Sequence, residues 1–199
     1  MKIVLIAILI ALWIYVLRVT RKGELYSWRY LVGSCGLFVI LMITVRPWLT
    51  QPLAQMVAAI SGITGKLTGM YEAFYKYGIL MVNAPGGSMT LLIDFECSGI
   101  LEIMAFLCLL IFFRAYTVWE KVLVGILGTF YLILTNSLRI TVICVMIHFW
   151  GVPAYYIAHT FVGRIFFFAV TLVMYFYVFT KAQIIRQKVG GFVYGNTDK

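Results

Sequence analysis

The sequence predicts an all-α integral membrane protein with about five transmembrane helices, six being the alternative count. Two observations support this fold class. Hydrophobic residues make up 63% of the 199 residues and the mean hydropathy is +1.00, which leaves too little polar surface to coat a soluble globule. The apolar residues also fall into repeated runs with short joints, and no polar stretch is long enough for a separate soluble domain. We therefore predict a single membrane domain over residues 1–199.

Five apolar runs are bounded by charges or turn residues and approach the length needed to cross roughly 30 Å of hydrocarbon at about 1.5 Å per residue. They cover about 2–18, 30–45, 98–113, 121–147 and 155–180. The first two are short for a span, and the fourth is long enough to tilt or to extend beyond the membrane. Because Arg18, Arg21 and Lys22 follow the first run, and no small-residue cleavage pattern accompanies it, we interpret it as a retained anchor and not as a secretory signal.

The distribution of cations predicts the orientation, since Lys and Arg concentrate in short cytoplasmic loops. One side of the predicted spans receives Arg18, Arg21, Lys22, Arg29, Arg114, Lys121, Lys181, Arg186, Lys188 and Lys199, and the other receives Lys2, Arg46, Lys66 and Lys76. We therefore expect a multi-pass protein of the cytoplasmic cell membrane with its amino terminus outside and its carboxyl terminus in the cytoplasm. This bias, together with the attraction of cations to anionic lipid headgroups, explains the net charge of +9. We therefore expect the lipid bilayer to be a partner and do not expect binding to nucleic acid.

In this orientation the long connection over about 46–97 lies outside. Apolar side chains recur in it at helical spacing, namely Leu53, Val57, Ile60, Met70, Phe74 and Tyr77. This pattern predicts one or two amphipathic helices on the outer leaflet. The cluster over 83–88 is a turn signal, and residues 89–95 are then expected to form a short strand or hairpin arm that leads into Cys97 and that an extended peptide can pair with.

Cys97 is the first candidate for chemistry. It is followed by Ser98 and Gly99 at the predicted start of the third span, where unpaired backbone N–H groups and the helix dipole favour a thiolate. The other cysteines, Cys35, Cys108 and Cys144, lie inside apolar spans, where packing explains them. A disulfide between Cys97 and Cys144 is an alternative, because both lie toward the outside.

Two cationic side chains in later spans are expected at a similar depth to Cys97. Arg139 follows Asn136 by three residues, so both lie on one helical face, and Arg139 can either snorkel to headgroups or donate hydrogen bonds to a developing oxyanion, an effect worth about 3 kcal/mol. His159 is followed by Gly163, which allows close approach of another backbone or a substrate, and it is either a polar anchor or a base. The competing imidazole, His148, is explained by an aromatic interfacial belt.

Other charged residues near these three leave alternatives open. Glu102 and Arg164 lie five residues beyond Cys97 and His159, and we expect them to pair and to fix the register of two helices. Asp94 and Glu96 are candidates either to contact a basic substrate or to orient His159. The two histidines lie on different segments without ligand spacing around them, so the sequence predicts neither a metal site nor a cofactor.

The order Cys97-Ser98-Gly99, then Asn136-x-x-Arg139, then His159-x-x-x-Gly163, in a membrane-spanning context, resembles the exosortase/archaeosortase family. The resemblance covers about 85–170, which we take as the catalytic core, and the compact chain looks most like the short Gram-positive XrtG type. It departs from the usual pattern in having fewer spans and in carrying Glu102, where many relatives have a basic residue. Members are regarded as multi-spanning Cys transpeptidases that process carboxyl-terminal sorting signals outside the cytoplasmic membrane.

The resemblance implies that Cys97 is the nucleophile, His159 the general base or acid, and Arg139 the stabiliser of the tetrahedral intermediate. The implied partner is a membrane-anchored protein substrate with a carboxyl-terminal hydrophobic helix, and the acceptor is an amine or a lipid- or glycan-linked group. With water as acceptor the same site is a protease. Two alternatives stay open: a non-catalytic membrane subunit or carrier, whose Arg139, Glu102, Arg164 and His159 form a polar conduit, and a lipid acyltransferase.

Overall fold

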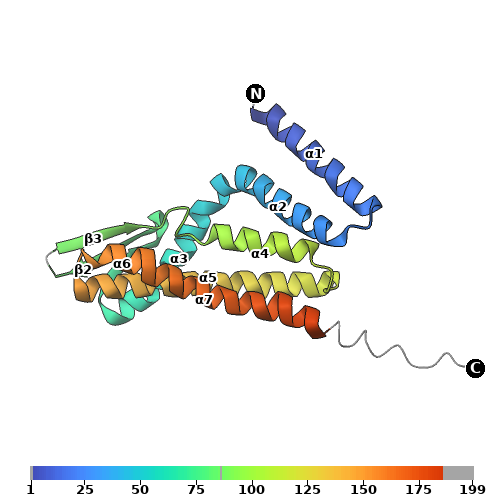
Figure 1. Cartoon of the computed structure of the whole chain (residues 1–199). Coiled ribbons are helices and arrows are strands. Elements are labelled where there is room, and N and C mark those ends of the chain that lie inside the picture. Colours follow the sequence, from blue (N-terminus) through green and yellow to red (C-terminus); the bar gives the residue numbers. More distant parts are fainter. Residues whose placement is uncertain (1, 86, 186–199) are drawn as a thin grey trace, which may run out of the picture.

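The computed structural model describes residues 2–85 and 87–185, with side chains described from residue 8 onward. The regular elements follow one another along the chain and are shown in Figure 1. They are α1 (Lys2–Lys22), α2 (Tyr26–Thr44), α3 (Arg46–Thr68), β1 (Tyr71–Phe74), the 3-10 turn η1 (Tyr75–Tyr77), β2 (Ile79–Ala84), β3 (Gly87–Leu92), α4 (Ile100–Phe112), α5 (Val118–Trp150), α6 (Ala154–Ile157), the π-helical η2 (Ala158–Val162), α7 (Gly163–Tyr175) and the π-helical η3 (Phe176–Lys181).

Each of the five predicted apolar runs falls largely within helical structure, but the count of five spans is not confirmed. Within the described residues, three helices are long and apolar enough to cross a membrane: Tyr26–Thr44, Val118–Trp150 and the continuous helical stretch Ala154–Ile185. Helix α4 is apolar but has only 13 residues, a length of about 20 Å. The chain is therefore a mostly helical membrane protein in which the number of crossings stays a prediction.

The prediction of an all-α fold was wrong in one part. Residues 71–92 form an antiparallel three-stranded sheet in the order β1-β2-β3, with Tyr71 opposite Val82 and Asn83 opposite Ser88. The second amphipathic helix expected near Phe74 and Tyr77 is consequently absent, because β1 and η1 occupy that stretch. The strand expected before Cys97 does form, as β3, although it ends before Ile93.

The sheet is held by packing on two helices. Leu80 and Val82 are fully buried two residues apart on β2, as the period of two in a strand requires, and they join Val57 of α3 and Ile143 of α5 in one core cluster. The Tyr71 hydroxyl donates to the Ser61 carbonyl oxygen at 2.7 Å. Helix α3 is thus the predicted amphipathic helix with Leu53 and Val57 buried, and its apolar face covers the sheet and α5.

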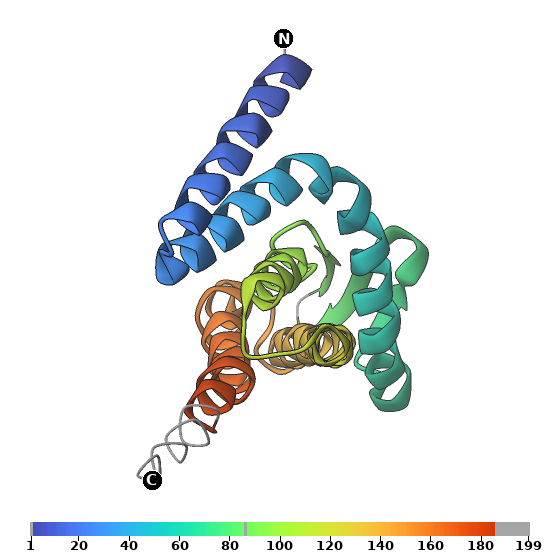
Figure 2. The ribbon, with the colours of Figure 1, turned by 90° about the vertical axis from the view of Figure 1, so that its right-hand side faces the viewer.

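The two ends of the molecule differ in character. The joint between α1 and α2, the joint between α4 and α5, and the end of η3 lie together at one end, whereas the sheet lies at the other and α4 begins between the two ends (Figure 1). Arg18, Arg114, Lys121 and Lys181 belong to the segments at the first end, while the orientation across the membrane stays a prediction; Arg186, Lys188 and Lys199 lie outside the described residues. Seen along the bundle, α4, α5 and α7 run side by side while α2 and α3 curve around them (Figure 2).

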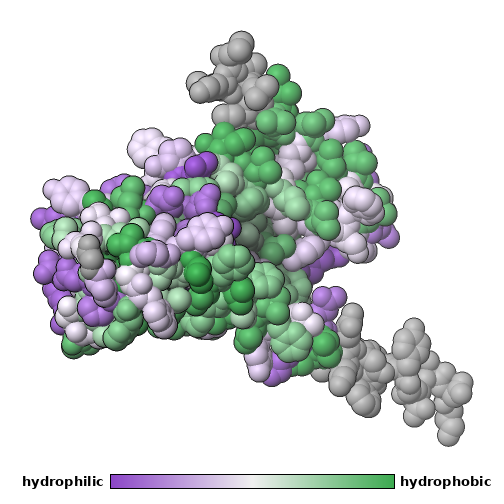
Figure 3. All heavy atoms as spheres, turned by 60° about the vertical axis from the view of Figure 1, so that its left-hand side comes forward, coloured by the Kyte–Doolittle hydropathy of each residue, from purple (hydrophilic) through white to green (hydrophobic). Residues whose placement is uncertain are grey.

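Hydropathy at the surface follows the same division. Hydrophobic residues cover much of the helical surface, and hydrophilic residues gather around the sheet end (Figure 3). Many large apolar side chains on the long helices are exposed, including Ile126, Phe130, Ile165 and Phe168. A contiguous apolar exterior of this kind is what lipid contact requires.

Candidate active site

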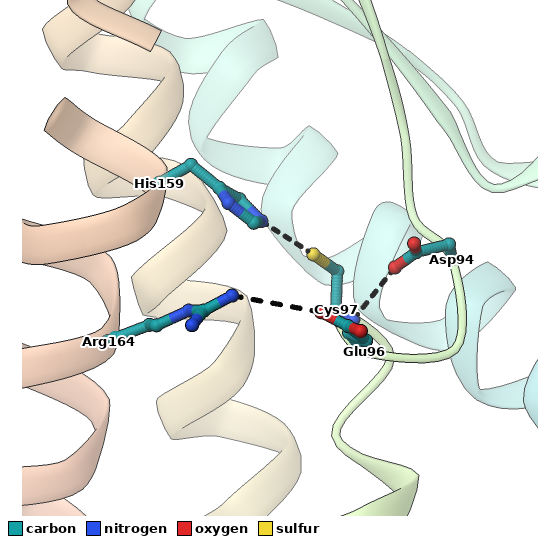
Figure 4. Close-up of polar contacts among 5 residues, drawn as sticks. All are labelled: Asp94, Glu96, Cys97, His159 and Arg164. Carbon is teal, nitrogen blue, oxygen red and sulfur yellow. Dashed lines mark hydrogen bonds and ion pairs between the residues drawn. The ribbon is translucent and has the colours of Figure 1, made fainter. Parts of the chain in front are cut away.

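The thiol of Cys97 contacts the imidazole of His159. Cys97 Sγ lies 3.0 Å from His159 Nε2, although 62 residues separate them in the chain (Figure 4). Cys97 is 7% exposed, and His159 is partly buried. Their separation is within the range for proton transfer between a nucleophile and its base.

A tight turn between β3 and α4 holds Cys97 in position. The backbone N–H of Cys97 donates to Asp94 Oδ1 at 3.1 Å, and its carbonyl oxygen accepts from Asn136 Nδ2 at 2.7 Å. Both peptide groups of the cysteine are therefore fixed, one by its own turn and the other by the fully buried Asn136 of α5. Asn136 therefore contacts Cys97 directly, while the Ser98 hydroxyl donates to the Phe95 carbonyl oxygen at 3.0 Å and has a local structural role.

Gly99 completes the turn in a left-handed conformation, with φ of +78°. A Cβ added there would lie 3.2 Å from Asn136 Nδ2. Glycine is thus required both by the backbone conformation and by the closeness of the amide that holds Cys97.

We expect Gly99→Ala to lower the free energy of unfolding by about 1–2 kcal/mol and to slow the reactions of Cys97, because the left-handed backbone is costly for alanine and the Cβ crowds Asn136. Thermal unfolding in detergent and alkylation of Cys97 measure the two effects. Gly69→Ala is the matched control, since Gly69 also has a positive φ, +70°, but has open space around its Cβ position. Equal Cys97 reactivity in the two variants would contradict the proposed contact.

His159 lies on a π-helical turn that the sequence did not reveal. Residues 158–162 form this turn between α6 and α7, and such turns occur frequently at functional sites. The imidazole stacks on Tyr155, with ring centroids 5.4 Å apart. Gly163 lies close to α5, because a Cβ added to it would be 3.0 Å from Ile143 Cδ1. The group that approaches Gly163 closely is therefore a neighbouring helix.

Arg139 is buried, which contradicts the alternative of a side chain that snorkels to the headgroups. It is 5% exposed, and its Nε has no hydrogen-bond partner among the described residues. The guanidinium carbon lies 5.6 Å from the centroid of the Phe167 ring, and its charge interacts with Cys97 and His159. A buried donor without a partner is costly, and beside a nucleophile it is available to a reacting group.

The predicted ion pair between Glu102 and Arg164 is not formed. Arg164 Nη2 instead lies 3.8 Å from Glu96 Oε2, and both side chains are more than half exposed (Figure 4). Glu102 Oε2 is buried without a hydrogen-bond partner in the described part of the chain. The reason is the turn before α4, which brings Glu96 to Arg164. Neither Asp94 nor Glu96 makes a hydrogen bond that orients His159, because Asp94 accepts from Cys97 and Glu96 pairs with Arg164.

The resting state of Cys97 also differs from the prediction. Helix α4 begins at Ile100, so the thiol lies in the preceding turn and not at the first helical residues. Burial raises the pKa of the Cys97 thiol to about 11, an effect that the charge of Arg139 opposes and that of Asp94 reinforces. The expected thiolate is therefore replaced by a neutral thiol. All four cysteines are free, so the alternative of a disulfide between Cys97 and Cys144 is excluded.

A pocket of about 400 Å³ includes Arg139, Glu96 and Arg164 in its lining; it adjoins the turn that contains Cys97, although neither Cys97 nor His159 lines it. A larger pocket of about 800 Å³ lies at the opposite end of the bundle, between α2 and η3. We associate function with the smaller one because of its buried unpaired polar groups and its position next to Cys97. Within residues 2–85 and 87–185 no cluster of three or more His, Cys, Asp or Glu side chains is arranged to hold a metal ion.

Fold and site together define a polytopic membrane protein with a Cys-His pair held between the turn before α4 and the π-helical turn η2. Comparison with protein families identifies which class this is: residues 2–177 match the family model described as Transmembrane exosortase (Exosortase_EpsH). The chain belongs to the exosortase family. No curated protein and no solved structure matches it.

Proposed function

We propose that the chain is a membrane-embedded cysteine transpeptidase of the exosortase type, with Cys97 as nucleophile, His159 as general base and acid, and Arg139 as the donor that stabilises the tetrahedral intermediate. The observation that carries the proposal is the 3.0 Å contact between Cys97 Sγ and His159 Nε2. Membership of the exosortase family supports it, since the family suggests a membrane transpeptidase. The region over 85–170 is then the catalytic core.

The first half of the reaction begins with a neutral pair. As Sγ attacks the scissile carbonyl carbon, the thiol proton passes to His159 Nε2, and the carbonyl oxygen gains negative charge. The backbone N–H of Cys97 already donates to Asp94, so it is not free to bind this oxygen. Arg139 supplies a donor without a competing partner, in a buried position where such a donor is most effective.

Collapse of the intermediate then breaks the C–N bond, and His159 returns its proton to the leaving amine. A thioester with Cys97 results. In the second half an acceptor amine, or a lipid- or glycan-linked nucleophile, loses a proton to His159 and attacks the thioester, and the departing Sγ takes that proton back. Water in place of this acceptor makes the enzyme a protease.

The expected substrate is a membrane-anchored protein with a carboxyl-terminal sorting signal, and the expected reaction site is the outer face of the cytoplasmic membrane. Support for the location comes from the distribution of charge. The α1–α2 and α4–α5 joints, which carry cations, lie at the end opposite to the sheet (Figure 1), and strand β3 of that sheet leads into the turn that contains Cys97. Cytoplasmic loops are the ones enriched in Lys and Arg.

The experiment that tests the Cys-His pair is alkylation of the purified protein with limiting iodoacetamide from pH 6 to pH 11, with mass-spectrometric mapping of the labelled cysteine. A thiol whose pKa is about 11 is thiolate in only ~10⁻⁴ of molecules at pH 7. We therefore expect the labelling rate of Cys97 to rise about tenfold per pH unit until it levels off near pH 11, with an additional contribution near neutral pH from proton transfer to His159.

His159→Ala is the control for that contribution. It should slow labelling near neutral pH and approach the wild-type rate at the highest pH, where the thiol ionises without help. Cys144, which is also buried and free, provides the comparison within the same chain. If Cys97 reacts no faster than Cys144 at neutral pH and the His159 variant changes nothing, the pair is structural.

Arg139→Lys separates transition-state stabilisation from thiol activation. We expect turnover to fall by about 10²-fold, equivalent to about 3 kcal/mol, because lysine keeps the charge but not the rigid array of donors. Alkylation of Cys97 should change little, since no oxyanion forms in that reaction. The matched control is Arg164→Lys at the exposed ion pair with Glu96, and equal losses in the two variants would contradict a special role for Arg139.

A further inference from the structure

The pocket beside Cys97 contains an unusual concentration of unsatisfied polar groups. Three of the four buried side-chain atoms that lack a hydrogen-bond partner among the described residues belong to residues that line it: Arg139 Nε, Glu102 Oε2 and Thr171 Oγ1. They come from three different helices, α5, α4 and α7. Because natural proteins pair nearly all buried polar atoms, three unpaired groups that converge on one pocket indicate a bound group that satisfies them.

The walls of the pocket are apolar. Phe95, Phe167 and Phe168 line it, and a neighbouring pocket of about 400 Å³ shares Glu102 and Thr171 but is otherwise almost entirely apolar. Polar recognition is therefore confined to the three unpaired groups. A volume of about 400 Å³ is in the lower part of the range for ligand pockets and suits one polar side chain with its adjacent backbone.

The charges in the pocket select against ionic ligand groups. Arg164 and Glu96 pair with each other at the exposed rim (Figure 4), which leaves one cation, Arg139, and one carboxylate, Glu102, inside. A cationic ligand group is repelled by Arg139 and an anionic one by Glu102. Arg139 and Glu102 interact through their charges, but an apolar group leaves the buried Arg139 Nε and Glu102 Oε2 atoms without a hydrogen bond. A neutral group that both accepts and donates hydrogen bonds satisfies all of these conditions.

We infer that this pocket is a specificity subsite for a carboxamide side chain, that of glutamine or asparagine, in the substrate residue next to the scissile bond. The carboxamide oxygen accepts from Arg139, and the NH₂ group donates to the Glu102 carboxylate and to the Thr171 hydroxyl. Glu102 and Thr171 are then specificity-determining residues of the enzyme. The inference rests on the proposed function, because it takes Cys97 as the attacking group.

The first experiment measures the rate at which peptide vinyl sulfones label Cys97. The probes are acetyl-dipeptides whose residue next to the electrophile is glutamine, methionine, glutamate or lysine. In each case the thiol sulfur bonds to the vinyl β-carbon, and the thiol proton ends on the α-carbon. We expect the glutamine probe to react at least ~10-fold faster than the methionine probe of similar shape, since methionine leaves the buried donors and acceptors unpaired.

Variants connect this preference to the pocket. Glu102→Leu should reduce the ratio between the rates of the glutamine and methionine probes to near one, and Thr171→Val should reduce the ratio in part. Two variants on different helices keep the test valid if one does not fold. Glu72→Leu, at an exposed position on β1, is the matched control and should leave the ratio unchanged.

A binding measurement separates failure of the subsite from failure of the proposed function. In the Cys97→Ser protein, the thermal unfolding shift caused by acetyl-glutamine methylamide is compared with that caused by the methionine analogue, with and without Glu102→Leu. Labelling of Cys97 by all four probes at equal rates overturns the subsite but not the enzyme. A glutamine-specific shift without labelling of Cys97 by any probe retains the subsite and overturns the cysteine mechanism. No labelling and no specific shift overturn both.

Discussion

Cys97→Ser should lower turnover by at least ~10³-fold, one of the two largest effects expected of a single substitution in this protein. The serine hydroxyl has nearly the size of the thiol, so the turn held by Asp94 and Asn136 stays intact, but an alcohol is a far weaker acid and nucleophile beside the same imidazole. The measurement compares cells that carry the wild-type or variant protein. Quantitative mass spectrometry of carboxyl-terminal peptides from membrane-anchored proteins reports uncleaved precursor.

Cys35→Ser is the control for this substitution, because Cys35 is free but lies on α2, exposed and away from the site. It should process substrate at the wild-type rate. Full processing by a folded Cys97→Ser protein would remove the cysteine mechanism and favour a non-catalytic polar conduit, which has no need for the thiol. If the trapped adduct on Cys97 carries a fatty acyl group and not a peptide, the alternative of a lipid acyltransferase gains support.

His159→Gln should lower turnover by about 10²–10⁴-fold. Burial keeps Cys97 protonated, since its pKa is raised to about 11, so a nearby base has to take the proton during attack. Glutamine keeps polar atoms near Sγ but cannot accept that proton. The loss should become smaller as pH rises toward 11, because the thiol then ionises without the imidazole, and a pH profile of single-turnover acylation measures this.

The second histidine of the chain provides a matched control. His148 Nδ1 lies 2.5 Å from the Asn83 carbonyl oxygen at the far end of α5, with no contact to Cys97, and His148→Gln should change turnover by less than about threefold, an expectation from its distance to the chemistry. If the His148 variant lost as much turnover as the His159 variant, both substitutions would be acting by destabilising the fold. Thermal unfolding of the two variants decides between these readings.

Much of the fold was predictable because the length and the spacing of the hydrophobic residues in a membrane helix are visible in the sequence. Hydrophobic runs long enough to cross a bilayer identified the helical stretches that became α2, α5 and the α6–η3 stretch. The sheet was harder to predict, since Met70, Phe74 and Tyr77 also match helical spacing. What decides the outcome there is pairing with β2 and β3 and the burial of Tyr71 against α3, and such contacts between distant segments are not visible in a local pattern.

The candidate site was likewise predictable from the sequence only in part. Residue chemistry singled out Cys97, Arg139 and His159, because a thiol, a guanidinium and an imidazole are costly near lipid unless something uses them. Their order in the chain supported the family resemblance. By contrast, the partners of Arg164 and Glu102, the π-helical turn at His159 and the role of Asp94 as acceptor for Cys97 depend on how the turn over 94–99 packs against α5 and α7.

By itself, then, the sequence determined the membrane class, the positions of the helices and the three residues proposed for the chemistry, since hydropathy, length and side-chain type are properties of the chain. Only the tertiary structure decided that Cys97 lies 3.0 Å from His159, that Arg139 is buried and not snorkelling, and that burial raises the pKa of the Cys97 thiol to about 11. The distance between Cys97 and His159 depends on how the fold brings together segments that are 62 residues apart in the chain. The acidity of the thiol depends on the water and charge that the fold places around it.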